Sequence, residues 1–89
     1  MNDFDEQLYR LGLKEVIEKY IKNYFDIHGG IPPSDGLYFR FMNEVERPLI
    51  EETLRRMKGN QVRVAKLLGI NRNTLRRKIL DLNIPLKNL

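Results

Sequence analysis

Glycine and asparagine divide the last third of the chain into two short segments, and this division limits what that third can form. Gly59-Asn60 and Gly69-Ile70-Asn71 each place a residue that readily ends a helix just before one that readily caps the next. Apolar residues recur at three- and four-residue spacing in both segments, as in helices with one buried face, and the predicted inward sets are Val64, Ala65, Leu67 and Leu68, then Leu75, Ile79 and Leu82. The sequence therefore predicts a short helix, a turn at Gly69, and a last helix that ends near Ile84-Pro85.

Two longer stretches upstream of this pair are also expected to be helical. The first is predicted from about residue 13 to residue 28, and Gly29-Gly30 ends it. The second runs from about residue 37 to residue 58 and carries Pro48 near its middle. Because the apolar spacing resumes at Leu49, the proline is expected to bend this helix without ending it. The predicted fold class is all-α, with four helices per chain.

The ends of the first long helix carry weaker signals. Residues 1–12 are predicted to be a linker or a frayed N-terminus, although Asp3 and Glu6 have the spacing of a capping box that could start a helix there. His28, the single histidine, precedes Gly29-Gly30 and is expected to lie at a helix end. Residues 31–36 are expected to form a loop, because they hold two prolines and a glycine.

The second long helix has more large apolar side chains than one small neighbour can cover. Either the helix of residues 13–28 covers them all, or a second copy of the chain covers the remainder, and the number of such residues on both helices favours a homodimer. We predict dimerisation helices over residues 13–58 and a functional unit of two short helices over residues 59–89, which together form one compact domain. The expected dimer contacts are Tyr38, Phe41, Met42, Val45 and Leu49.

Charge is distributed unevenly along the chain. The net charge is −2 over residues 1–30, zero over residues 31–58 and +6 over residues 59–89, where Asp81 is the single acid. A positive field confined to one segment suits a polyanion, because neutralising phosphates and releasing their counterions supplies much of the affinity for nucleic acids. The alternative is an ordinary solvated basic surface that complements the dipole of the last helix.

Composition speaks against several classes of function. The chain has no cysteine, so it has no disulfides, no thiolate nucleophile and none of the common zinc-finger ligand sets. No nucleophile has a suitably spaced partner, and the loop glycines lack the lysine and hydroxyl residue of a phosphate-binding loop. We therefore expect no enzyme activity, catalytic residue, metal or cofactor. Because no apolar run approaches the roughly 20 residues needed to span a bilayer, we expect a cytoplasmic protein without membrane contact.

Two short helices joined by a glycine-containing turn form the helix-turn-helix plan, whose second helix enters the major groove of DNA. Placing Leu75, Ile79 and Leu82 inward at 100° per residue points Asn73 and Arg77 directly outward, with Thr74 and Arg76 on the shoulders. Arginine suits bidentate bonding to guanine and asparagine to adenine. Aromatic residues, which stack on single-stranded bases, are missing from this segment. The residues therefore predict a contact with duplex DNA.

The segment "EVERPLIEETLRRMKGNQVRVAKLLGINRNTLRRKI" resembles the Fis-type DNA-binding module. Fis nucleoid proteins share this module with the C-terminal domains of NtrC-class bacterial enhancer-binding activators. The resemblance covers residues 21–84 and is strongest from Glu44 onward. It implies a homodimer in which the first two helices of each subunit form a four-helix core, while the two C-terminal helix-turn-helix pairs bind adjacent major grooves and bend the DNA.

The resemblance also implies roles for individual residues. Arg72 and Arg77 match positions that reach base edges, whereas Asn71 and Thr74 match positions near DNA at the start of the last helix. The positions expected to contact the DNA backbone are Asn60, Arg76 and Lys78. Val62 departs from the pattern, because Fis nucleoid proteins carry a hydroxyl residue there, beside a phosphate. Residues 1–12 also lack a counterpart of the N-terminal arm of those proteins.

Within this family, "PPSDGLY" before "EVERPLI" and the acidic start are most similar to the C-terminal domain of an NtrC-class activator. The resemblance then implies enhancer sites upstream of sigma-54 promoters, with contact to sigma-54 RNA polymerase through other domains of a longer protein. The alternative is a stand-alone nucleoid protein that bends DNA. From a different class, the chain would be a dimerisation or docking module whose basic end is incidental.

Overall fold

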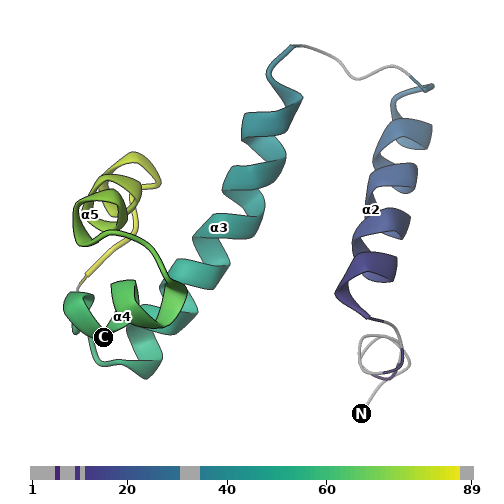
Figure 1. Ribbon diagram of the computed structural model, residues 1–89. Coiled ribbons are helices and arrows are strands. Elements are labelled where there is room, and N and C mark those ends of the chain that lie inside the picture. Colours follow the sequence, from purple (N-terminus) through teal and green to yellow (C-terminus); the bar gives the residue numbers. More distant parts are fainter. Residues whose placement is uncertain (1–5, 7–9, 11, 31–34, 87–89) are drawn as a thin grey trace. The chain divides into compact units, whose positions relative to one another are not determined.

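The computed structural model describes residues 6, 10, 12–30 and 35–86. These residues form α2 (Leu13–Ile27), α3 (Leu37–Arg56), α4 (Gln61–Leu68) and α5 (Arg72–Asp81), and they contain no strand (Figure 1). For the described residues the predicted all-α class is confirmed, and the four predicted helices are present. The capping box at Asp3 and most of the loop expected over residues 31–36 lie outside the described residues.

The chain divides into two compact units, residues 1–35 and residues 36–89. The first unit contains α2, in which no residue is buried and the apolar side chains of Val16, Ile17, Tyr24 and Phe25 are half-buried. His28 is the C-cap of this helix, and its ring centroid lies 4.6 Å from that of Tyr24. The expectation that His28 lies at a helix end is confirmed.

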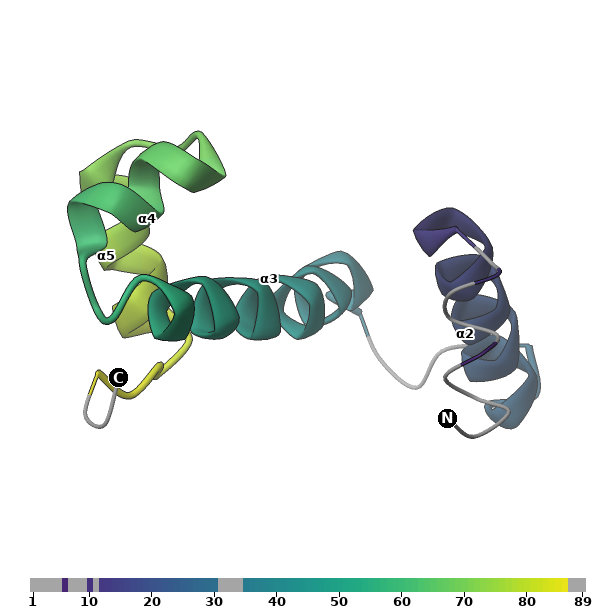
Figure 2. The ribbon, with the colours of Figure 1, turned by 90° about the horizontal axis from the view of Figure 1, so that it is seen from below.

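The second unit is built around one core to which α3, α4 and α5 all contribute. The buried apolar residues are Ile50 and Leu54 of α3, Val64 and Ala65 of α4, Leu75 and Ile79 of α5, and Leu82 and Ile84 after it. Helix α4 packs against both α3 and α5 (Figures 1 and 2). Residues 36–58 and residues 59–86 therefore share one core.

The predicted inward faces of the two short helices are correct except at Leu67, whose side chain is 59% exposed. The core face of α4 is centred between Val64, Ala65 and Leu68, and at 100° per residue Leu67 points about 100° away from that centre. Apolar spacing alone did not resolve this, because four apolar residues on a helix of eight span more than one face.

Helix α3 continues through Pro48, as predicted. Its broad apolar surface consists of two regions, one in each half of the helix. The C-terminal half buries Ile50, Thr53 and Leu54 in the core, and the Thr53 hydroxyl donates a hydrogen bond of 2.7 Å to the Leu49 carbonyl. The N-terminal half leaves most of its large apolar side chains exposed, among them those of Tyr38, Phe39 and Val45. The core of the second unit thus accounts for part of the surplus apolar surface seen in the sequence.

Each helix of the second unit ends with the same backbone device. The amide of Gly59 donates a hydrogen bond of 2.8 Å to the Leu54 carbonyl. The amide of Ile70 donates one of 3.0 Å to the Ala65 carbonyl, and the amide of Ile84 donates one of 3.0 Å to the Ile79 carbonyl. Such a bond requires a left-handed residue just before the donor, and Lys58, Gly69 and Asn83 have φ of 52°, 73° and 53°. These ends set where α4 and α5 begin.

Candidate nucleic-acid interface

Asparagine side chains fix the starts of α4 and α5. The Asn71 Oδ1 accepts a hydrogen bond of 2.7 Å from the amide of Asn73, and the Asn60 Oδ1 accepts one of 3.2 Å from the amide of Arg63. Both caps were predicted from the sequence and are confirmed. An asparagine cap satisfies one of the amides that a helix start leaves without a partner, so the other amides of that turn stay available to an anion.

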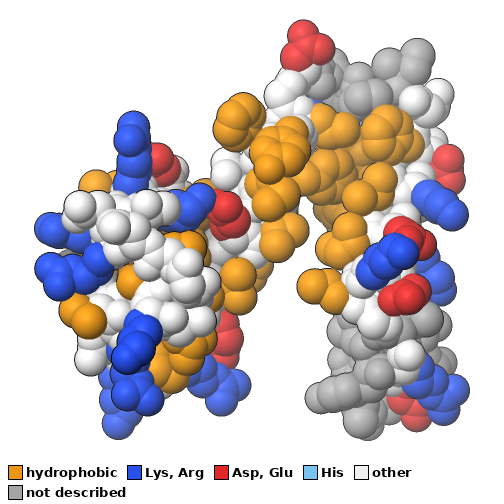
Figure 3. All heavy atoms as spheres, in the orientation of Figure 1, with side chains coloured by type: hydrophobic (Ala, Val, Ile, Leu, Met, Phe, Trp, Pro, Cys, Tyr) orange, Lys and Arg blue, Asp and Glu red, His pale blue; other side chains and the backbone are white. Residues whose placement is uncertain are grey.

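The outer side of α5 carries the polar residues that the sequence placed there. Leu75 and Ile79 are buried, and Asn73 and Arg77, on the opposite side of the helix, are exposed. Thr74 and Arg76 are also exposed. In the space-filling view, lysine and arginine side chains surround the part of the molecule formed by α4 and α5 (Figure 3).

Arg72 and Arg76 share the flank of α5 that faces the start of α4. Both side chains line a shallow hollow together with Gly59, Gln61 and Val62. Two guanidinium groups therefore lie beside a helix N-terminus, where amides and the helix dipole favour negative charge. Asn60, which caps that N-terminus, belongs to the same neighbourhood.

Three arginines of α3 have acidic partners, whereas those of α5 have none among the described residues. Arg47 pairs with Glu51 at 2.9 Å, while Arg55 and Arg56 both pair with Glu52. The hydrogen bond from Arg56 lowers the pKa of the Glu52 carboxyl. In the part of the chain that the structure describes, no carboxylate lies within ion-pair distance of the guanidinium groups of α5, those of Arg72, Arg76 and Arg77. Their positive charge is available to a ligand.

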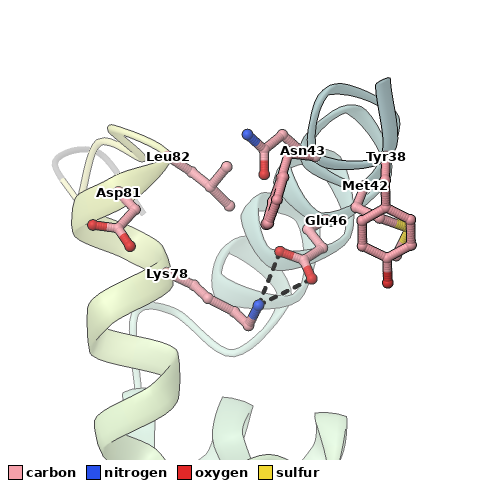
Figure 4. Close-up of a pocket in the computed structure, with 8 residues that line it drawn as sticks. Tyr38, Met42, Asn43, Glu46, Lys78, Asp81 and Leu82 are labelled. Atoms are coloured by element: carbon pink, nitrogen blue, oxygen red, sulfur yellow. Dashed lines mark hydrogen bonds and ion pairs between the residues drawn. The ribbon is translucent and has the colours of Figure 1, made fainter. Parts of the chain in front are cut away.

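Lys78 is placed differently from the other sequence-predicted residues. Its Nζ donates to both carboxylate oxygens of Glu46 on α3, at 3.0 Å each (Figure 4). Sequence reasoning missed Glu46, because the two residues are 32 positions apart and helical spacing relates only near neighbours. One signal was present: Glu46 precedes Ile50 and Leu54 at four-residue intervals, so it lies on the face of α3 that turns toward α5.

The five predicted dimer contacts lie on one face of the N-terminal half of α3. At 100° per residue they fall within about 100° of one another. Phe41 is half-buried, and the other four are exposed: Tyr38, Met42, Val45 and Leu49. Figure 3 shows hydrophobic side chains gathered over this half of the helix. The structure thus brings these residues together into one apolar stripe.

The described residues offer no other evident site for chemistry. Within them, no three histidine, cysteine, aspartate or glutamate side chains gather where a metal ion would fit. None of the helices that the structure describes has the length and apolar character needed to cross a membrane.

Comparison with known proteins identifies the family to which the chain belongs. Residues 41–82 match a family described as bacterial regulatory protein, Fis family. The DNA-binding protein Fis of Proteus vulgaris is 38% identical over 74 residues, which cover 83% of this chain and 78% of that protein. The chain belongs to the Fis family. The matched region contains both α4 and α5 as well as the Glu46–Lys78 pair.

Larger proteins are also similar to the chain. The DNA-binding transcriptional regulator NtrC of Azospirillum brasilense is 53% identical over 73 residues, and that of a Bradyrhizobium strain is 49% identical over 70 residues. The matches cover 82% and 78% of this chain. The chain spans 15% of the length of the first of these proteins and 14% of the second.

Proposed function

We propose that this chain binds double-stranded DNA as a homodimer and prefers particular sequences, with α5 inserted into the major groove. The observation that carries the proposal is the outer face of α5, which presents arginine and asparagine side chains that have no acidic partner among the described residues, on a helix-turn-helix frame. Membership of the Fis family supports it, because the chain is similar to proteins named as DNA-binding regulators. A protein with this function acts at the nucleoid, in the bacterial cytoplasm, and needs no cofactor.

In this proposal the direction in which each α5 side chain points determines which part of the DNA it contacts. Asn73 and Arg77 point straight into the groove and read bases, and Arg72 reaches a base edge from the flank. Asn71 and Thr74 lie close to DNA at the start of the helix. Arg76 and Asn60 contact the backbone beside the α4 N-terminus, where amides favour a phosphate.

The homodimer is supported by the apolar stripe of α3. Monomeric proteins seldom leave several large apolar side chains together in water, and such a patch is typical of a protein interface. A dimer with a twofold axis would present two α5 helices to successive major grooves, about 34 Å apart along the duplex. DNA that bends toward the protein would let both helices enter together, which agrees with the bending implied by the family resemblance.

Within the family, we favour an NtrC-class activator. Support comes from the identity of 53% to the Azospirillum NtrC, against 38% to the Proteus Fis. The DNA sites would then be enhancers upstream of sigma-54 promoters, and other domains would contact sigma-54 RNA polymerase. A stand-alone nucleoid protein is the second candidate, because the chain spans 78% of the Proteus Fis. An antibody raised against residues 36–86 distinguishes the two, since the native protein would be several times larger than 10.6 kDa only in the first case.

Affinity for duplex DNA is expected to fall steeply with salt. Each phosphate neutralised contributes about −0.9 to the slope of log K against log salt, so a dimer that neutralises four to six phosphates gives a slope of roughly −4 to −5. Fluorescence anisotropy with a labelled duplex, over a series of potassium chloride concentrations, measures this slope. The matched control is Lys22→Gln on α2, which removes one positive charge far from α5 in sequence and should leave the slope unchanged. A flat line for the unmodified protein would refute DNA binding.

Replacing Arg77 or Arg76 with alanine is expected to have two different effects. Arg77→Ala should cost about 1 to 3 kcal/mol on the preferred sequence and relax the preference at one base pair. Arg76→Ala should weaken all duplexes alike and reduce the magnitude of the salt slope by about 1 per site. Binding to a set of duplexes that differ at single positions measures both. If Arg76→Ala relaxes one base position and Arg77→Ala does not, the two assignments must be exchanged.

A further inference from the structure

We infer that Glu46 and Lys78 act as an orienting ion pair that sets the angle of α5 on α3, and that Lys78 is a positioning residue and not a phosphate contact. This inference deepens the proposed function and rests on it, because α5 is the helix proposed to read DNA. It replaces the sequence-based expectation that Lys78 contacts the DNA backbone.

The geometry of the pair suits a structural role. The Lys78 ammonium lies 3.0 Å from each carboxylate oxygen of Glu46, so both oxygens accept a hydrogen bond (Figure 4). The two side chains are only 33% and 28% exposed. By contrast, the ion pair of Arg56 with Glu52 lies within α3, and its side chains are 75% and 47% exposed. A partly desolvated pair is screened less by salt and water than an exposed one, so it restrains its two helices more strongly.

Lys78 also lies beside the proposed DNA-reading face and not at its centre. At 100° per residue it follows Arg77 by one step around α5, on the side opposite to Arg76. That side faces α3: Lys78, Asp81 and Leu82 of the α5 region line a pocket together with residues of α3 that include Asn43 and Glu46 (Figure 4). To reach a phosphate on the outer face, Lys78 would have to leave both carboxylate oxygens.

The packing of the second unit allows the ion pair to influence the angle between α3 and α5. Close helix packing joins α3 to α4 and α4 to α5. Between the N-terminal half of α3 and the end of α5 lies a pocket of about 350 Å³, which packed side chains do not fill. The angle between α3 and α5 is therefore set through α4 and the shared core on one side, and through the Glu46–Lys78 pair on the other.

This angle matters because α3 carries the stripe proposed to form the dimer. If two α3 helices meet in the dimer, the orientation of α5 on α3 decides how far apart, and at what tilt, the two α5 helices stand. Half-sites on DNA are one helical turn apart, so an error in that separation weakens binding at the correct spacing. The pair should therefore affect discrimination between DNA sites and leave the number of neutralised phosphates unchanged.

The test compares Glu46→Gln and Lys78→Gln in the full chain. Glu46→Gln removes a negative charge and Lys78→Gln a positive one, so a purely electrostatic effect on DNA affinity would have opposite signs. Loss of orientation predicts the same sign for both. We expect each variant to lose up to about fivefold in the ratio of affinities for two duplexes, with an unchanged salt slope. The probes are a duplex enriched from a random pool by the unmodified protein and a shuffled duplex of equal length.

Two further variants complete the experiment. The charge exchange Glu46→Lys with Lys78→Glu rebuilds the pair in reverse and should restore the affinity ratio. Glu44→Gln, which removes an exposed acid two positions away on the same helix, is the matched control and should leave the ratio unchanged. Thermal unfolding of each variant, followed by circular dichroism, shows that the compared proteins are folded.

A readout without DNA separates this inference from the proposed function. Residual dipolar couplings of the amides in α3 and α5 report the angle between the helices in the free protein, and this angle should change in both single variants and return in the exchange. An unchanged angle in both variants would overturn the orienting role. A uniform loss of DNA affinity in Lys78→Gln, with a smaller salt slope and a gain in Glu46→Gln, would identify Lys78 as a phosphate contact. Failure of the unmodified protein to bind DNA contradicts the proposed function alone.

Discussion

Replacing Leu54 with alanine is expected to destabilise the second unit by about 2 to 5 kcal/mol, because the lost methyl and methylene groups leave a cavity that the neighbouring side chains only partly fill. Leu54 is fully buried, with 0% exposure, and lies in the one core that joins α3 to α4 and α5. A small domain has a free energy of unfolding at the lower end of about 5 to 15 kcal/mol, so this single change removes a large share of it.

Urea unfolding followed by the circular dichroism of the helices measures the effect of Leu54→Ala. The matched control is Leu67→Ala on α4, which removes the same atoms from a side chain that is 59% exposed and should change stability by less than about 0.5 kcal/mol. Both proteins must be compared at one chain concentration, since the proposed dimerisation would link stability to concentration. Equal losses for the two variants would contradict the core described for this unit.

The core also explains why the proposed dimer and DNA-reading parts are not independent bodies. The boundary predicted at residues 58 and 59 separates two functions, but Ile50 and Leu54 of α3 are buried against Val64 and Leu75 of α4 and α5. Helices α4 and α5 are short, with 8 and 10 residues, and isolated helices of that length are marginal in water. The C-terminal half of α3 is therefore structurally part of the helix-turn-helix.

Local features of the fold could be predicted because local chemistry decides them. Asn60 and Asn71 cap helices wherever their side-chain oxygens reach the first amides, and Gly69 ends a helix because it adopts positive φ at little cost. The inward direction of Leu75 and Ile79 follows from helical periodicity. Lys58 was not predicted as a left-handed residue: the sequence pattern pointed to Gly59, one position later.

Features that depend on tertiary contacts could not be predicted in the same way. The breadth of the apolar surface of α3 indicated that the helix has two neighbours, but it did not show which residues contact which neighbour. In the structure Ile50 and Leu54 lie in the core, and Val45 does not. The Glu46–Lys78 pair joins residues whose approach depends on the turn between α3 and α4, and on that between α4 and α5. No local spacing contains that information. The DNA contacts of the individual α5 residues stay predictions.

Val45→Glu is expected to abolish the dimer and, with it, about 100-fold or more of the affinity for DNA that carries two half-sites, because linked binding of two modules exceeds single binding by that order. Val45 lies in the middle of the stripe formed by Tyr38, Phe41, Met42, Val45 and Leu49 and is 43% exposed in the single chain. A carboxylate there is solvated in the monomer and desolvated in an apolar interface. The substitution therefore opposes association without disturbing the core of the second unit.

Sedimentation velocity gives the mass of the Val45→Glu protein, and titration with duplexes carrying one or two half-sites gives its affinity. Val45→Ile is the matched control: it keeps the stripe apolar and should remain dimeric with unchanged preference. The contrast between duplexes is decisive, since a monomer with an intact α5 binds a single half-site as the unmodified chain does and loses only the gain from the second. If the Val45→Glu protein is still a dimer, the apolar stripe is not the dimer interface. If it is a monomer whose affinity for two half-sites is undiminished, DNA binding does not depend on dimerisation.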